Sequence, residues 1–323
     1  MLRFTFINVG FGEAVLLEYA YDGGHFTALI DGGSARAAEY FGPGRVSVDE
    51  YLRSSWIQKI DLLICTHFHQ DHVGGLLKAA RVCKMDEFWR PCENFPSAAV
   101  SPGIAENDSQ RNCIDGMNLY IDLLSHLKEN GCKITPQCGI KEKIPLRKGL
   151  LVDILGPERE RCEKLQRYLA VVEASETDSG KRRSIGEMDA WLNQSSMILR
   201  FHYAGRKILL PSDVSKSGIS YLFARPELLS ADVLKIAHHG IPDCMDGELA
   251  RYISPSVAVT CTSSDRRYGS ADSAVYDFLL RENKDLVLGF TDGMGYGEAA
   301  PEPRSGFVVE IGADGAIGTG VKL

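Results

Sequence analysis

The sequence lacks several features that would place it in a specialised class of protein. It has no C-x-x-C pair. The number of cysteines, nine, is odd, and they are spread from Cys65 to Cys261. We therefore expect reduced thiols rather than a disulfide framework. The first residues contain no apolar run of signal-peptide length, and no window approaches the roughly 18 apolar residues that a membrane span requires. These absences predict a cytoplasmic protein with no membrane partner.

An excess of positive charge is also lacking. The formal net charge is −7 and the isoelectric point is about 5.7, which disfavours a broad basic surface for nucleic acid or an anionic membrane. An apolar content of 44% and a charged content of 24% are typical of a soluble globular protein. A small-molecule or nucleotide-type anionic substrate is therefore favoured over nucleic acid as the partner, and the sequence says nothing of protein partners.

Strand patterns dominate both ends of the chain, and helical patterns lie between them. The predicted strands cover residues 2–10, 13–20, 25–33, 59–66, 150–157, 195–213 (a hairpin), 230–240, 256–264, 285–293 and 306–323. The predicted helices cover residues 71–83, 117–131, 158–175 and 270–283, while 88–116 and 176–187 are predicted loops. This order predicts one α+β domain over residues 1–323, with two sheets covered by helices and a helical and loop insertion at 157–190.

Three of the eight histidines lie within the stretch "THFHQDH", residues 66–72. A tight loop can aim His67 and His69 at one point, and Asp71 and His72, at the start of a helix, at a second point. Imidazole nitrogen and carboxylate oxygen suit zinc or manganese at a hydrolytic centre. The stretch therefore predicts ligands for two metal ions.

Two distant segments end buried strands with further ligand types. A carboxylate at Asp213 is costly after an apolar strand unless it is paired or bound to a metal. His238 and His239 end another strand, where adjacent side chains face opposite ways, so one of them is expected to be a ligand. We favour His238 and assign His239 to a supporting hydrogen bond. His25, His126 and His202 are predicted to be surface or structural residues.

The pattern H-x-H-x-D-H resembles the signature of the metallo-β-lactamase superfamily. "ALIDGGS" resembles the first motif of that superfamily, with Asp31 in it, "ILLPSDV" the fourth and "DVLKIAHHG" the fifth. Among subgroups, "VGFGEA", "NQSS" and "HHG" are most similar to the soluble domain of DNA-uptake competence channel proteins and its free-standing relatives. The resemblance implies a four-layer αββα sandwich of two mixed sheets, and two zinc ions, with manganese as the alternative, bridged by Asp213.

Two departures from the superfamily pattern affect the expected site. Where a third histidine is usual, twenty residues before Asp213, the chain has Asn193. The resemblance therefore leaves the first ion with His67, His69 and Asp213, helped by Asn193 or Ser196. The second departure is Ser270, which stands where the subgroup has a histidine. Arg266, Arg267 and Tyr268, just before it, are the expected substrate-binding residues together with Ser270.

The expected activity is that of a metal-dependent hydrolase in which two ions activate a hydroxide. Asp71 orients that nucleophile and Asp213 joins the ions, and the resemblance favours a phosphodiester or related phosphoester as substrate. Hydrolysis of a carboxylic ester, lactone or thioester is the alternative, since the same pair of ions serves both. A non-catalytic metal-binding module that recognises nucleic acid or takes part in signalling, and a di-iron redox protein, are further alternatives.

Overall fold

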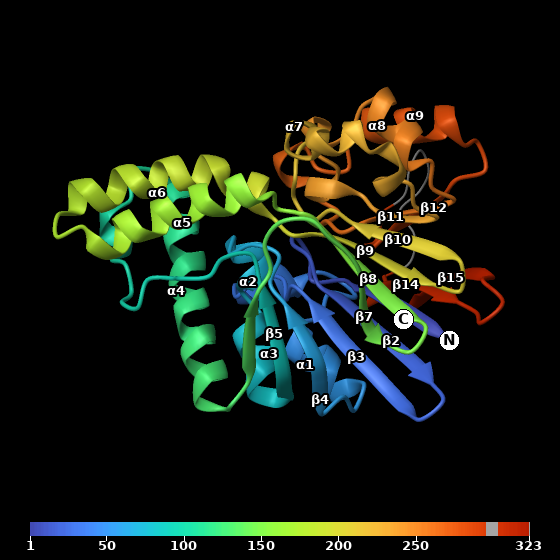
Figure 1. Cartoon of the computed structure of the whole chain (residues 1–323), viewed down its shortest axis with the longest axis horizontal. Helices are drawn as coiled ribbons and strands as arrows, with labels where there is room; N and C mark the ends of the chain where they lie inside the picture. The colour runs from blue at the N-terminus through green and yellow to red at the C-terminus, as the bar shows by residue number, and fades with distance from the viewer. Residues whose placement is uncertain (295–302, 323) are drawn as a thin grey trace.

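The computed structural model describes residues 1–294 and 303–322, so the predicted last residue of the C-terminal strand, 323, lies outside the described residues. Within them, two mixed sheets stack face to face (Figure 1). The first has the order β15-β14-β1-β2-β3-β4-β5-β6 and the second β13-β12-β11-β10-β9-β8-β7. Strand pairing therefore places β3 beside β4, and β10 beside β11, in parallel register.

The strands of the first sheet are short and apolar on the face that meets the second sheet. They are β1 (Leu2–Ile7), β2 (Val15–Tyr21), β3 (Gly24–Ile30), β4 (Lys59–Ile64), β5 (Lys84–Arg90), β6 (Lys133–Pro136), β14 (Gly306–Ile311) and β15 (Ile317–Lys322). Those of the second sheet are β7 (Lys141–Arg147), β8 (Leu150–Gly156), β9 (Ile198–Tyr203), β10 (Arg206–Leu210), β11 (Val233–Lys235), β12 (Val257–Thr260) and β13 (Val287–Phe290).

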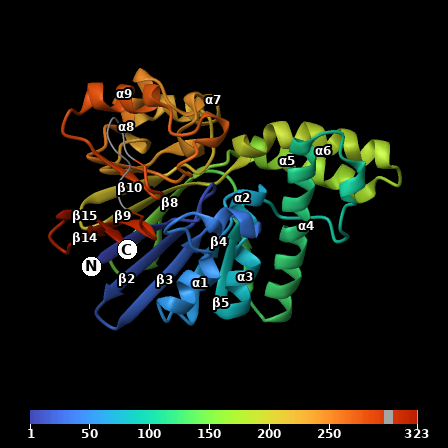
Figure 2. The ribbon, with the colours of Figure 1, turned by 180° about the vertical axis from the view of Figure 1, so that it is seen from behind.

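Helices cover the outer face of each sheet (Figures 1 and 2). Those on the first sheet and beside it are α1 (Val48–Ser54), α2 (Gln70–Val73), α3 (Leu76–Val82), α4 (Asp108–Glu129), α5 (Arg159–Ala174) and α6 (Asp178–Leu192). Those on the second are α7 (Lys216–Ile219), α8 (Gly247–Ile253) and α9 (Ser273–Glu282).

Three apolar clusters hold these layers together. One lies between the sheets and includes the edge-to-face pair of Phe4 and Phe201, with ring centroids 5.5 Å apart. A second lies under α1–α6, and a third under α7–α9. Because each sheet has apolar side chains on both faces, helices outside and sheet contact inside are both required. The predicted αββα sandwich of two mixed sheets is confirmed.

Two predicted loops are wrong. Helix α4 begins at Asp108, inside the predicted loop 88–116, because the Asn107 side chain accepts a hydrogen bond from Gln110 N and caps the helix. Helix α6 fills the predicted loop 176–187. Its polar sequence conceals an apolar stripe in which Ile185 and Met188 are fully buried. Helices α5 and α6 lie side by side and project beyond the edge of the sheets (Figures 1 and 2); that residues 157–190 are an insertion stays a prediction.

The expectation of reduced thiols is wrong for one pair of cysteines. A disulfide joins Cys138, between β6 and β7, to Cys162 in α5. The other seven cysteines are free and buried. Over the described residues, no helix is both long and apolar enough to cross a membrane. The cytoplasmic location stays a prediction.

The buried stripe of α6 can be tested by truncation. We expect Ile185→Ala to lower the free energy of unfolding by about 2–5 kcal/mol, because it leaves a cavity against α4 and α5. Val171→Ala on α5 is the control, since Val171 is 43% exposed and its truncation should cost less than about 0.5 kcal/mol. The measurement is urea unfolding; equal stability of the two variants would mean that this segment does not pack as a helix.

Candidate metal centre

The expected ligands converge at one edge of the sandwich because parallel strands end there together. Asp31 directly follows β3, and His67 comes three residues after the end of β4. Asp213 and His238 likewise follow β10 and β11 of the other sheet. Since the carboxyl ends of parallel strands meet at the same edge, residues far apart in the sequence meet in space.

The backbone is strained where it delivers these side chains. Asp31, Ser212, His238 and His239 all have a positive φ, between 48° and 56°. A non-glycine residue in this left-handed region costs about 1–3 kcal/mol, and such residues gather at functional sites. The segment "GFGE" packs against the histidine loop: a Cβ at Gly12 would lie 2.4 Å from the Asp71 carbonyl oxygen. Gly12 therefore permits this close approach.

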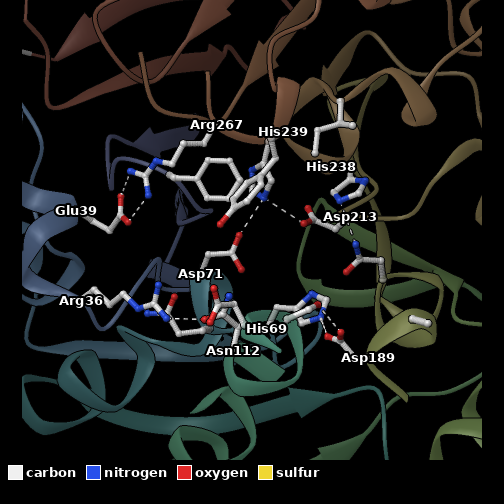
Figure 3. Close-up of a pocket in the computed structure, with 18 residues that line it drawn as sticks. Arg36, Glu39, His69, Asp71, Asn112, Asp189, Asp213, His238, His239 and Arg267 are labelled. Atoms are coloured by element: carbon white, nitrogen blue, oxygen red, sulfur yellow. Dashed lines mark hydrogen bonds and ion pairs between the residues drawn. The ribbon is translucent and has the colours of Figure 1, made fainter. Parts of the chain in front are cut away.

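Four side chains form the tightest set of possible ligands (Figure 3). They are Asp71, His72, Asp213 and His239, and one ligand atom from each lies within 4.8 Å of every other. Asp213 Oδ2 lies 3.0 Å from His72 Nε2 and 3.1 Å from His239 Nε2. His239 Nε2 lies 3.2 Å from Asp71 Oδ2.

In both His72 and His239, a hydrogen bond at Nδ1 leaves Nε2 available to bind a metal. His239 Nδ1 donates to the Cys261 carbonyl oxygen at 2.8 Å, and His72 Nδ1 donates to Asp31 Oδ2 at 2.8 Å. In the neutral ring each Nε2 then carries a lone pair that faces carboxylates. Burial alone would lower the pKa of His239, but Asp213 and Asp71 raise it to about 9. A proton or a cation is thus strongly favoured at this point.

His238 lies outside the tightest set of possible ligands, and the preference for it over His239 stays a prediction. His238 Nδ1 donates to Asp243 Oδ1 at 3.0 Å, and its Nε2 lies 3.1 Å from Asn193 Nδ2. Both ring nitrogens therefore have protein partners outside the set. The preference for His238 assumed extended backbone, whereas both histidines are left-handed, with φ of 48° and 55°.

His67 and His69 form a second, smaller set. His67 Nε2 and His69 Nδ1 are 3.1 Å apart. Thr66 Oγ1 donates to Asp31 Oδ2, so it can accept from His67 Nδ1, 3.2 Å away. Burial, then the neighbouring His72, lowers the pKa of His67 well below its usual value, which keeps that ring neutral. The His67 ring centroid lies 4.1 Å from that of His72, so the two sets adjoin.

Asp189 of α6 supports His69 and was missed in the sequence. Its Oδ1 lies 3.4 Å from His69 Nε2, and Ser109 of α4 donates to its other oxygen. A carboxylate at Nε2 fixes the tautomer in which Nδ1 is the free nitrogen. No sequence signal could have found Asp189, because α6 was predicted as a loop.

Asn193, at the place of the expected third histidine, faces the pocket with one unsatisfied atom. Its Oδ1 is buried without a hydrogen-bond partner among the described residues, and so is Ser196 Oγ. Asn193 lines the pocket, whereas Ser196 is not among the described lining residues. Only Asn193 of the two is therefore placed to supply an oxygen to an ion.

Asp31 forms hydrogen bonds that orient possible ligands, and it is not itself a member of the tightest set. It is fully buried, and its carboxylate accepts hydrogen bonds from His72 Nδ1, from Thr66 Oγ1 and from the Thr66 amide. Asp31 also belongs to a set with Glu13 and His72 whose atoms are close enough for an ion. The nitrogen of His72 on that side already carries its proton toward Asp31, so a hydrogen bond joins these two members of the second set.

A buried lysine holds the other oxygen of Asp213. Lys235 Nζ forms an ion pair with Glu13, lies 3.5 Å from Asp213 Oδ1 and donates to the Ser212 carbonyl oxygen. Burial alone would lower the pKa of Lys235, but Glu13 and Asp213 raise it above its usual value, so the ammonium stays charged. A lysine within the apolar strand "DVLKIA" was a signal that sequence analysis overlooked.

The predicted substrate-binding segment is only partly exposed to the pocket. Arg267 forms a bidentate ion pair with Glu39, and Ser270 Oγ is buried and accepts from Thr262 Oγ1. Arg266 Nη1 donates to the Ala271 carbonyl oxygen. Of the four predicted residues, Arg267 and Tyr268 line the pocket in the part of the chain that the structure describes, while Arg266 and Ser270 do not.

The pocket that opens onto these ligands has a volume of about 510 Å³. Arg36, Asn112, Glu39 and Arg267 lie on one side of it and Asp189 on the other (Figure 3). Arg36 donates to Asn112 Oδ1 at 2.6 Å, and its side chain is 51% exposed. Its guanidinium is therefore more available to a ligand than that of Arg267, which Glu39 neutralises.

Comparison with known proteins shows what the chain is similar to. Residues 7–93 match the family model of the metallo-β-lactamase superfamily. Over 289 residues the chain is 23% identical to "ComE operon protein 3" of Bacillus subtilis (strain 168), an alignment that covers 86% of this chain and 30% of that protein. Residues 7–93 are thus similar to that superfamily, and the chain spans less than a third of the length of the relative that it matches.

Two solved structures are similar over nearly the whole chain. "Igni18, a novel metallo hydrolase" from Ignicoccus hospitalis KIN4/I is 15% identical with a TM-score of 0.45, covering 99% of this chain and 98% of its own. The "metallo-beta-lactamase fold protein YhfI" from Bacillus subtilis is 13% identical with a TM-score of 0.43, covering 95% and 98%. At these scores the likeness adds no argument about this chain.

The role of Lys235 can be tested in the metal-free protein. Lys235→Met leaves the Glu13 and Asp213 carboxylates buried together, so we expect a loss of about 3–5 kcal/mol in the free energy of unfolding. Lys84→Met is the control, since the Lys84 side chain is 74% exposed. Adding Glu13→Gln to Lys235→Met should restore part of the loss. A Lys235→Met variant as stable as the wild type would contradict this role.

The role of Asp189 predicts a loss of metal affinity. Asp189→Ala should weaken the less tightly bound zinc ion by about 10–100-fold, because His69 loses the partner that fixes its tautomer. Glu187→Ala removes the same charge from an exposed position of α6 and should leave affinity unchanged. The measurement is zinc competition with a chelator, and two ions bound as tightly in Asp189→Ala as in the wild type would refute the assignment.

Proposed function

We propose that the chain is a metal-dependent hydrolase that binds two ions and cleaves a phosphodiester or related phosphoester. The observation that carries the proposal is the convergence of ring nitrogens and carboxylate oxygens in two adjoining sets. His72 and His239 direct Nε2 toward Asp213 Oδ2, while His67 Nε2 faces His69 Nδ1. Facing lone pairs repel one another unless a proton or a cation lies between them, so the arrangement suits metal ions.

The donor types fit zinc, with manganese as the alternative. Nitrogen and oxygen donors in sets of three or four are usual for catalytic zinc. The set of Asp71, His72, Asp213 and His239 offers four ligands, whereas His67 and His69 would draw on Asn193 Oδ1 and on Asp213 to complete theirs. We therefore expect the ion at His67 and His69 to bind more weakly. When bound, two such ions polarise the substrate and lower the pKa of a water molecule.

The chain's own residues then orient the reacting groups. Asp71 is the ligand carboxylate that is open to the pocket, with a side chain 21% exposed against 4% for Asp213. It is placed to accept the proton that an attacking water gives up. Lys235 lies beside Asp213 Oδ1, and Asp213 Oδ2 is directed toward both histidines of its set. Asp213 would hold the ions that the two sets bind.

A phosphoester is favoured over a carboxylic ester by one arginine that lines the pocket. Arg36 is half exposed there and can form paired hydrogen bonds to a phosphoryl group. This assignment moves anion binding from Arg266 and Arg267 to Arg36. The resemblance to the competence-protein subgroup supports the same class of substrate.

Adjacent histidines supply the sharpest test of the metal set. We expect His239→Ala to lose one bound zinc ion and more than about 100-fold in hydrolysis of bis(p-nitrophenyl) phosphate, because it removes a ligand. His238→Ala should keep two ions, because both nitrogens of His238 bond outside the set. The measurements are metal content by mass spectrometry and release of p-nitrophenolate.

The controls distinguish the alternative activities. p-Nitrophenyl acetate and a lactone are assayed beside the phosphodiester with Zn²⁺ and Mn²⁺. Faster turnover of either carboxylic ester would overturn the phosphoester assignment. Two bound ions with no turnover of any substrate would favour a non-catalytic module, and loss of zinc in His238→Ala but not in His239→Ala would refute the ligand set.

A further inference from the structure

Tyr268 is an exposed aromatic residue beside the candidate metal centre. Its side chain is 72% exposed, and it lines the same pocket as Asp71, Asp213 and His239. Burial of an aromatic ring is among the larger apolar contributions to stability. A tyrosine that leaves its ring at the mouth of a pocket forgoes most of that contribution, so the ring is available to a ligand.

The backbone around Tyr268 is held in a costly conformation. Tyr268 has φ 57° and ψ 20°, and Arg266 and Ala271 in the same loop also have positive φ, each of 50°. Such conformations persist only where surrounding contacts impose them. A Cβ at Gly269 would meet nothing within 4 Å, so the loop projects into open space instead of being packed under other elements.

The contacts that hold the loop are made by its neighbour. The Arg267 guanidinium pairs with both carboxylate oxygens of Glu39, and its Nε donates to Asp265 Oδ2 at 2.9 Å. The same guanidinium lies 5.4 Å from the ring centroid of Phe11. Figure 3 shows the Arg267–Glu39 pair on the side of the pocket away from Asp189. Arg267 therefore anchors the loop, and Glu39 neutralises its charge.

Phe11 connects Tyr268 to the metal centre. The rings of Phe11 and Tyr268 meet edge to face, with centroids 5.2 Å apart and an interplanar angle of 69°. The Phe11 ring lies 4.6 Å from that of His239. The distance between the Tyr268 and His239 rings is therefore at most the sum of these two centroid distances. A ligand held at the metal centre can reach the Tyr268 ring.

We propose that Tyr268 and Phe11 form a stacking subsite for a planar aromatic group that the substrate carries next to its phosphoryl group. The ligand class is an aryl or nucleoside phosphoester, whose phosphate faces Arg36 and the metal set while its ring stacks on Tyr268. Stacking suits this position because the Tyr268 ring and the ring of the substrate would both present apolar surfaces. The charge of the neighbouring Arg267 is neutralised by Glu39. The proposal rests on the proposed function, of which it specifies the substrate.

Two matched phosphodiesters test the subsite. Bis(p-nitrophenyl) phosphate and methyl p-nitrophenyl phosphate release the same p-nitrophenolate but retain an aryl or a methyl group. We expect Tyr268→Leu to lower the ratio of their kcat/KM values, aryl over methyl, by about tenfold, mainly through KM, because a stacking contact is lost. Tyr268→Phe should keep the wild-type ratio, and so should Phe41→Leu, since Phe41 is 83% exposed and outside the pocket lining among the described residues.

Binding of products separates this proposal from the hydrolase proposal. Adenosine 5′-monophosphate and ribose 5-phosphate differ only in the base, and their dissociation constants on the zinc-loaded protein are measured by calorimetry. We expect tighter binding of the nucleotide, and loss of that difference in Tyr268→Leu. Hydrolysis of neither diester would overturn the hydrolase assignment while this comparison still tests the subsite. Equal binding of the two ligands, or a Tyr268→Leu variant with unchanged ratios, would overturn the subsite.

Discussion

The structure depends on one electrostatic constraint: Asp213, whose side chain is only 4% exposed, has to be surrounded by positive charge. Two histidines face its Oδ2 and Lys235 faces its Oδ1. A buried carboxylate without such partners would cost several kcal/mol. The pKa of Asp213 shows the balance, because burial alone would raise it while His239 and His72 lower it well below its usual value. Metal ions would take the place of protons in this arrangement.

The fold meets this constraint by bringing the ends of two sheets together. The first sheet supplies the histidine loop after β4, and the second supplies Asp213 and His239 after β10 and β11. Asp31, at the end of β3, joins the two because it accepts from Thr66 and His72 while Ser212 Oγ donates to Thr66 Oγ1. Left-handed backbone at these strand ends is the local cost of this convergence, and the apolar core between the sheets offsets it.

The helical pair α5–α6 adds a feature that the sandwich alone would not have. Asp189 reaches His69 from α6, so the packing of this pair acts on the smaller ligand set. The disulfide between Cys138 and Cys162 fixes the pair at the same end, because the start of α5 lies beside the end of α6. In the proposed function the two sides of the pocket would differ in role: α6 would orient His69 on one side, and Tyr268 would contact a substrate ring on the other.

Sequence patterns predicted the sandwich, and they also predicted several side chains that the structure brings together. The H-x-H-x-D-H run and the strand-end Asp213 were visible because polar side chains suited to metal binding followed apolar strands. The choice between His238 and His239 depended on backbone dihedrals, which residue type does not determine. Asp189 was missed because the polar sequence of α6 was predicted as a loop. Arg267 was assigned to the substrate because its partner Glu39, 228 positions away, could not be recognised in the sequence. Pairings at such sequence separation are known only once the fold is known.

The most direct measurement is anomalous diffraction at the zinc edge from crystals of the zinc-loaded protein. The account predicts two peaks about 3.5–4 Å apart. One should be bounded by Asp71, His72, Asp213 and His239, and the weaker one by His67 and His69. A zinc peak at His238 with none at His239, or no peak among these side chains, would contradict the central claim.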